Sequence, residues 1–189
     1  EHRLHQYKLN AVRAFARENR IDRIIIESKT PKLGVITTGK SYLDVRQALE
    51  DLGIDEVKAD KLGLRLYKVG MPWPLEPAGI KEFSQGLKEI LVVEEKRPII
   101  ESQLKEHLYN LPSNERPSVV GKFDEKGHVL QPAAGELSPS QIARVIASRL
   151  LKLGEDKAIQ EKLKLMDDKE KSLIKPETDF ARTPFFCSG

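Results

Sequence analysis

The chain has 189 residues, of which 39% are hydrophobic and 32% are charged, so it can bury one core and is not disordered. Its 32 basic residues nearly balance 29 acidic ones, and a net charge of +3 gives no general attraction to nucleic acid. No apolar run approaches the roughly 20 residues that span a bilayer, and no signal-peptide core is found near the start. The single cysteine, Cys187, excludes an internal disulfide framework. We therefore expect a soluble, cytoplasmic protein without nucleic-acid or membrane partners.

The first segment, residues 1–22, is predicted to be a lead-in helix. Its apolar side chains recur at helical spacing and would share one face of an amphipathic helix: Leu4, Tyr7, Ala11, Ala14 and Phe15. No aromatic residues are interleaved with its basic ones, so we interpret the basic side as a solvated face or an interdomain contact. Because the chain starts at Glu1 rather than Met, we expect it to be a piece of a longer protein.

A short apolar strand is predicted at residues 24–26, followed by a turn at residues 29–32. The turn leaves too few residues for a helical crossover to the next strand. These two strands should therefore not be parallel neighbours.

Residues 34–41 match two incompatible patterns. Gly34, Gly39, Lys40 and Ser41 spell the G-x-x-x-x-G-K-S phosphate loop of nucleotide hydrolases. Residues 35–38 are all β-branched, however, which favours a strand that Gly34 opens. Under this preferred interpretation Ser41 caps a helix that runs to Leu52.

Further strands are predicted at residues 62–69, 90–93 and 118–123, and helices start at Pro77, Pro98 and Ser138. Glu94 and Glu95 follow the second of these three strands and could hold a metal beside a phosphate loop. We prefer to assign them to the positive end of the following helix.

Alternating strands and helices predict an α/β fold over residues 23–154, a three-layer αβα sandwich around a mostly parallel sheet. Residues 155–189 then form a charged linker helix and the start of another domain. Ligands or neighbouring domains meet such a sheet at the carboxyl ends of its strands. We expect interdomain contacts there from Thr38, Gly39, Lys40, Gly70, Pro72, Glu94 and Glu95.

No catalytic cluster is evident from residue types alone. The four histidines are scattered without ligand spacing, and no serine lies in a nucleophile elbow. Three functions stay open at this point: a scaffold domain, a phosphate-loop nucleotide hydrolase, and a module that binds coenzyme A or a nucleotide, although G-x-G-x-x-G is absent.

Three segments together resemble the indolepyruvate ferredoxin oxidoreductases, a branch of the 2-oxoacid:ferredoxin oxidoreductases. They are Gly-Val-Ile-Thr-Thr-Gly at 34–39 followed by Tyr42, Tyr-Lys-Val-Gly-Met-Pro-Trp-Pro-Leu at 67–75, and Leu-Val-Val-Glu-Glu at 91–95. The resemblance implies that this segment has the fold of the transketolase C-terminal domain. It also implies a multidomain, homo-oligomeric enzyme that decarboxylates an arylpyruvate on thiamine diphosphate and Mg²⁺. Electrons would pass through an iron–sulfur cluster to ferredoxin, and coenzyme A would accept the acyl group.

The chain's last residues, Phe186-Cys187-Ser188-Gly189, are similar to the start of that family's F-C-x-G-C-P-H motif. The resemblance implies that Cys187 ligates iron in the full-length enzyme. This chain alone cannot hold a cluster, because a cluster takes about four cysteines and the chain has one. It places the thiamine-binding residues in other domains, so we expect this chain alone to bind no cofactor and to be inactive.

Overall fold

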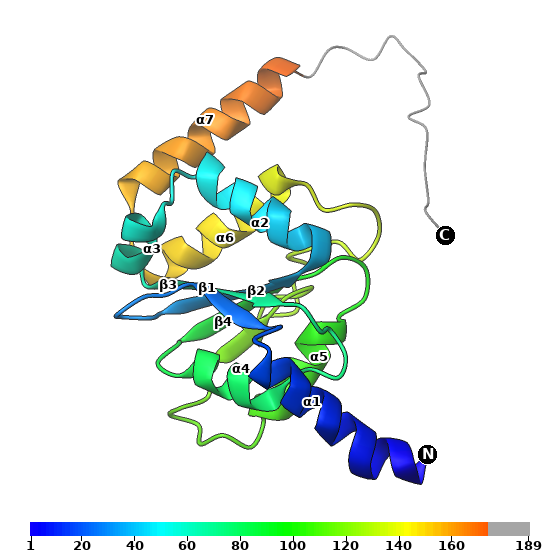
Figure 1. Cartoon of the computed structure of the whole chain (residues 1–189). Helices are drawn as coiled ribbons and strands as arrows, with labels where there is room; N and C mark the ends of the chain where they lie inside the picture. The colour runs from blue at the N-terminus through cyan, green and yellow to red at the C-terminus, as the bar shows by residue number, and fades with distance from the viewer. Residues whose placement is uncertain (174–189) are drawn as a thin grey trace, which may run out of the picture.

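The computed structural model describes residues 1–173, and its centre is a five-stranded sheet with helices on both faces (Figure 1). The strands are β1 (Arg23–Ile26), β2 (Leu33–Thr38), β3 (Leu64–Val69), β4 (Glu89–Val93) and β5 (Ser118–Val120). Their order in the sheet is β1-β3-β2-β4-β5, with β1 antiparallel and every other pair parallel. The predicted α/β sandwich is confirmed, and the first two strands are not neighbours.

Helices form a layer on each side of this sheet (Figure 1). Above it lie α2 (Gly39–Asp51), α3 (Glu56–Leu62), α6 (Pro139–Leu153) and α7 (Lys157–Leu173); below it lie α1 (Leu9–Glu18), α4 (Pro77–Ser84) and α5 (Ile99–Leu108). Successive side chains of β2 enter opposite cores, Val35 on the α2 side and Ile36 on the α4 side. Both are completely buried, and each contributes about 1.5–3 kcal/mol of hydrophobic free energy.

The predicted cap of α2 is wrong. Thr38 is the N-cap residue and α2 begins at Gly39, so Ser41 lies inside the first turn and is buried. Gly39 has φ +54°, a conformation that glycine adopts without strain. The chain can therefore turn out of β2 into the helix one residue after the strand ends.

Sequence patterning also missed α3. Asp55 caps this helix by accepting a hydrogen bond from the Lys58 N–H at 2.8 Å, and Gly63 ends it in a left-handed conformation with φ +76°. A helix of seven residues is too short to show a clear apolar period. As a result β3 begins at Leu64, two residues later than predicted.

The strand predicted at residues 118–123 is shorter in the structure. Strand β5 stops at Val120, before the predicted Phe123, and Phe123 forms an isolated bridge with Val129 instead. Helix α4 ends at Ser84, so Leu87 packs against its core from the following turn.

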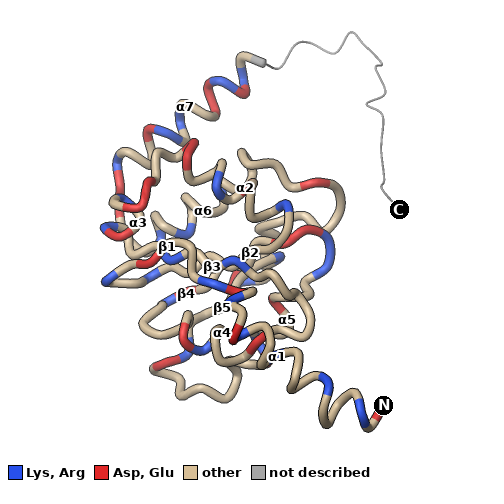
Figure 2. The backbone as a smooth tube through the Cα atoms, viewed as in Figure 1, with Lys and Arg blue, Asp and Glu red and all other residues tan. Residues whose placement is uncertain are grey.

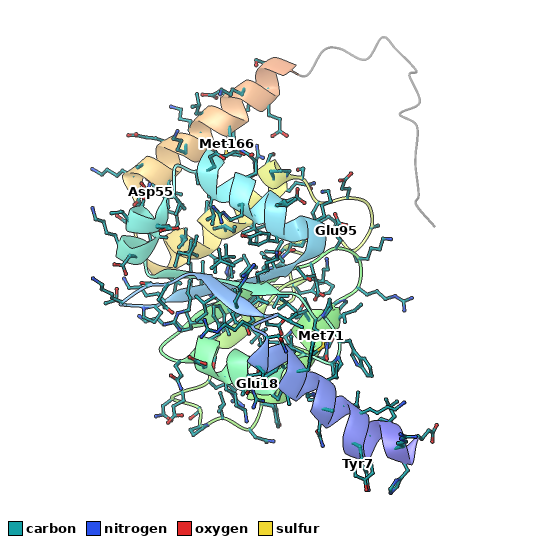
Figure 3. The ribbon with its side chains drawn as sticks, in the orientation of Figure 1. Tyr7, Glu18, Asp55, Met71, Glu95 and Met166 are labelled. Atoms are coloured by element: carbon teal, nitrogen blue, oxygen red, sulfur yellow. The ribbon has the colours of Figure 1, made fainter. Side chains whose placement is uncertain are left out.

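The apolar face predicted for the first helix is not the face that packs on the domain. A π-helical turn, η1 (Leu4–Lys8), leads into α1, and the fully buried residue is Ala16. The side chains predicted to share one apolar face, including Leu4, Tyr7 and Phe15, are exposed, and Figure 3 shows Tyr7 pointing away from the body of the protein. Periodicity shows that a helix has an apolar face but does not say what covers it.

At the other end, α7 buries Ile159 in the core cluster above the sheet, with Leu163 and Met166 packed partly against it. The boundaries proposed for the lead-in helix and the linker stay a prediction. Within the described residues no helix has the length and apolar character needed to cross a bilayer.

Candidate functional site

The residues singled out at strand ends do share one edge of the sheet. Because β2 is parallel to both β3 and β4, with Thr38 aligned to Val69 and Thr37 to Val93, the three carboxyl ends lie side by side. The Thr38 hydroxyl donates a hydrogen bond to the Val69 carbonyl at 2.8 Å. This carboxyl edge is where a ligand or a neighbouring domain would meet the sheet.

Lys40 follows the end of β2 at the carboxyl edge and forms ion pairs with carboxylates around it. Its ammonium lies 2.8 Å from Asp44 and 2.7 Å from Glu136, and 3.7 Å from Glu95, which Figure 3 labels at this edge. The hydrogen bonds to Asp44 and Glu136 raise the pKa of Lys40, so it stays protonated. Lys40 therefore links α2 to the loop before α6 and has no free charge to offer a phosphate.

The structure contains no phosphate-binding loop at residues 34–41, because most of this segment is strand or helix. Residues 35–38 are paired with β3 on one side, and residues 35–37 with β4 on the other, so their backbone groups serve the sheet. Gly34 is glycine for packing reasons, since a Cβ there would lie 2.5 Å from Leu87 and 2.8 Å from Phe83. Both glycines of the motif thus have a structural role that needs no nucleotide.

The Gly70–Pro72 corner is held by two side chains that sequence analysis did not identify. Asp22 accepts hydrogen bonds from the N–H groups of Gly70 and Met71, at 2.7 and 3.0 Å. Gln103 donates to the Pro72 carbonyl at 2.8 Å and accepts from the N–H of Leu75, also at 2.8 Å. Burial raises the pKa of Asp22 although the two backbone N–H groups oppose the shift.

Glu94 caps α5, as the preferred interpretation predicted. Its carboxylate accepts hydrogen bonds from the N–H groups of Ile99, Ile100 and Glu101 at 3.1, 2.9 and 3.0 Å. All three oxygen contacts are directed at the start of a helix, where a negative charge is favourable. In residues 1–173 no group of three His, Cys, Asp or Glu side chains is placed to hold a metal ion.

A buried lysine completes this end of the sheet. Lys122 is 4% exposed, and its ammonium donates to the backbone carbonyl of Glu94 while its N–H donates to Glu101 at 3.0 Å. Burial lowers the pKa of Lys122, against the attraction of Glu94 and Glu101. The sequence pattern at residues 118–123 predicted a strand but not the contact of Lys122 with Glu101. That contact depends on α5, which packs beside this segment.

A buried ion pair lies at the opposite, amino end of β4. Arg149 of α6 donates two hydrogen bonds to Glu89, and the same guanidinium reaches Glu125 at 2.8 Å. Hydrogen bonds from Lys152 and then from Arg149 lower the pKa of Glu125 to about 2. The signal available in the sequence was an arginine within the apolar stripe of α6.

Two surface grooves lined by residues within 1–173 contain no catalytic arrangement. A 660 Å³ groove between α2, α3 and β1 has an apolar floor that includes Ile26 and Ile54, with Glu50, Asp55 and Glu56 among its lining residues. A 390 Å³ groove between α1 and α4 contains the ion pair of Arg17 with Glu76. Charges of both signs are spread along the helices and loops rather than gathered at one face (Figure 2).

The described residues do not fit the cofactors that the sequence resemblance implies. The polar groups at the carboxyl edge are largely committed to one another, and residues 1–173 provide no metal cluster. Cys187, the predicted iron ligand, lies outside the described residues. We derive no chemical step through thiamine diphosphate or a cluster on these residues.

Comparison with known proteins agrees with the sequence resemblance. The family model of the indolepyruvate ferredoxin oxidoreductase middle domain matches residues 22–176. Indolepyruvate oxidoreductase subunit IorA of Pyrococcus abyssi is 35% identical over 103 residues, which are 53% of this chain and 15% of the relative. IorA of Pyrococcus horikoshii is 40% identical over 74 residues, 39% of this chain and 10% of the relative.

Among solved structures, the 2-oxoglutarate:ferredoxin oxidoreductase from Magnetococcus marinus is similar, with a TM-score of 0.45 and 18% identity over 76% of this chain and 23% of that one. The matched part of this chain spans only about a seventh of the P. abyssi relative. The family model, by contrast, covers the whole sheet and the helices from α2 to α7, and leaves out only η1 and α1 among the described elements. This chain belongs to the indolepyruvate ferredoxin oxidoreductase middle-domain family.

Proposed function

We propose that the chain is the central structural domain of an oxidoreductase that decarboxylates indolepyruvate or a related arylpyruvate. Thiamine diphosphate, Mg²⁺ and an iron–sulfur cluster are bound by other parts of the enzyme, coenzyme A accepts the acyl group, and ferredoxin accepts the electrons. The enzyme is cytoplasmic and homo-oligomeric. The observation that carries this proposal is the family match over residues 22–176.

The carboxyl edge supports a role in positioning. Lys40 and Glu94 are engaged by groups of the same domain, so these residues give the edge a fixed shape rather than a reactive group. Thr38, Gly39, Gly70, Pro72 and Glu95 lie at the same edge and, together with these two, are the proposed contacts with the neighbouring domains.

The complete polypeptide that contains this chain tests the proposal. With thiamine diphosphate, coenzyme A and indolepyruvate it should reduce ferredoxin, and omission of any one of them should abolish the reduction. Replacing indolepyruvate with 2-oxoglutarate should lower the rate by at least tenfold. A polypeptide that reduces ferredoxin equally well with 2-oxoglutarate would contradict the proposed substrate.

The same assay tests Cys187, with its neighbour Ser188 as the matched control. Cys187→Ala in the complete polypeptide should lower the iron content and ferredoxin reduction together, while Ser188→Ala should leave both unchanged. Unchanged iron and electron transfer in the cysteine variant would remove Cys187 from the cluster.

A further inference from the structure

The N-terminal helix carries an apolar surface that nothing in the described residues covers. We call it the outer stripe: Leu4, Tyr7, Ala11 and Phe15, which follow one another at helical spacing along η1 and α1. Leu4, Tyr7 and Phe15 are 39%, 64% and 59% exposed. Large apolar side chains aligned along one face, rather than scattered, mark an interaction surface.

Only the end of this helix is fixed to the domain. Ala16 is buried, and the neighbouring Arg17 pairs with Glu76 at the start of α4, whereas η1 contains no buried residue. Figure 1 shows the helix extending away from the sheet toward its N-terminus. Helices of this length are marginally stable in water without tertiary packing, so a covering surface would stabilise its first turns.

We infer that the outer stripe docks onto another domain of the same oxidoreductase, on an apolar surface whose rim carries carboxylates. The inference rests on the proposed function, in which this chain is one part of a larger enzyme. The matched stretch makes up 15% and 10% of two curated relatives, so most of such a polypeptide lies outside this domain.

Charge determines the chemistry of the rim. Exposed Arg3 and Lys8 flank Leu4 and Tyr7, and Figure 2 shows the basic segments along this helix. Residues 1–20 contain five basic and two acidic side chains, and the basic ones are Arg3, Lys8, Arg13, Arg17 and Arg20. An acidic rim would match this charge and would disfavour wrong partners.

A second copy of the chain fits the stripe less well. Two N-terminal segments that pair with each other bring together like net charges. The acid-lined groove between α2 and α3 has suitable chemistry, but it lies above the sheet while α1 lies below it (Figure 1). Docking α1 of one copy into that groove of the next is a head-to-tail contact, which builds open filaments unless the rotation closes a ring.

Hydrogen exchange of residues 3–18 tests the inference. These amides should exchange at least tenfold more slowly in the complete polypeptide than in the present chain, and their exchange in the chain alone should not depend on protein concentration. Equal exchange in the two proteins would overturn the inference. Protection that grows with the concentration of the chain alone would overturn it in favour of a second copy.

Two variants identify the surface. In the complete polypeptide Tyr7→Glu should remove most of the protection of residues 3–18, and Tyr7→Phe should retain it. Val57→Glu is the control, since Val57 is also 64% exposed but lies on α3, and it should leave that protection intact. If Tyr7→Glu and Val57→Glu behave alike, the stripe is not the contact.

The ferredoxin assay separates this inference from the proposed function. If residues 3–18 are protected in a complete polypeptide that does not reduce ferredoxin, the docking surface is supported and the proposed activity is contradicted. If the complete polypeptide reduces ferredoxin but residues 3–18 are not protected, the proposed activity is supported and the docking surface is contradicted.

Discussion

Arg149 is 6% exposed and holds Glu89, which is 3% exposed, so this pair excludes water from both charges. Removing one partner of a buried pair is costly because it leaves the other charge without compensation. Replacing both with apolar residues of similar volume costs much less.

Arg149→Met should therefore lower the free energy of unfolding by about 3 kcal/mol, and the double variant Arg149→Met with Glu89→Leu should recover most of that loss. Urea denaturation of the two variants and the parent measures both values. A double variant no more stable than the single one would show that the arginine acts through packing alone.

The same cluster has a defined pH dependence. The pKa of Glu125 is lowered in the folded state, so its stabilising contribution is complete above the ordinary glutamate pKa and is lost as pH falls toward about 2. In the arginine variant part of this acid-dependent loss should already be absent, because Arg149 is one of the two hydrogen-bond donors to Glu125.

Residues such as Arg149, Asp22 and Lys122 show what sequence analysis could not provide at this scale. Asp22 caps backbone groups at Gly70 and Met71, and the partners of Arg149 and Lys122 are also remote in the chain. Residue type and local spacing contain no information about which distant group a side chain will meet.

At the scale of elements, local patterns identified the caps of α5 and α6 but placed the cap of α2 at the wrong residue. The two identified caps are Glu94 for α5 and the Ser138 capping box at the start of α6. Apolar periodicity did not reveal α3, a short helix that is defined by its cap at one end and a glycine at the other. It also did not reveal which face of α1 is covered, because that depends on tertiary packing. The grouping of the strand-end residues at the carboxyl edge was predictable because parallel strands end together.

Glu94 provides the test at this scale. Glu94→Ala removes the acceptor for three N–H groups of α5 and should lower the free energy of unfolding by about 1–2 kcal/mol. Glu94→Gln keeps one acceptor oxygen and should lose about half as much. Thermal unfolding with hydrogen exchange at residues 99–101 measures the effect, and faster exchange in the alanine variant is the expected local sign. An alanine variant as stable as the parent would show that water satisfies these donors.

For the whole molecule, we expect the two hydrophobic cores on either side of the sheet to be sufficient for independent folding. The isolated chain should unfold in one cooperative transition, yet it should not consume indolepyruvate when thiamine diphosphate and a redox dye are supplied. Circular dichroism on heating and a turnover assay check the two parts. Turnover by the isolated chain would place the reaction within this domain.

The position of β1 has a consequence for synthesis on the ribosome. β1 pairs with β3, with Ile24 opposite Tyr67 and Ile26 opposite Leu66, and β2 does not touch it in the sheet order. At about 5–20 residues per second, its partner emerges roughly 2–8 seconds after β1 itself. During that interval three consecutive isoleucines have no strand to pair with and are exposed to chaperones. The N-terminal helix, which is joined directly to β1, can take its final place only after β3 has been made.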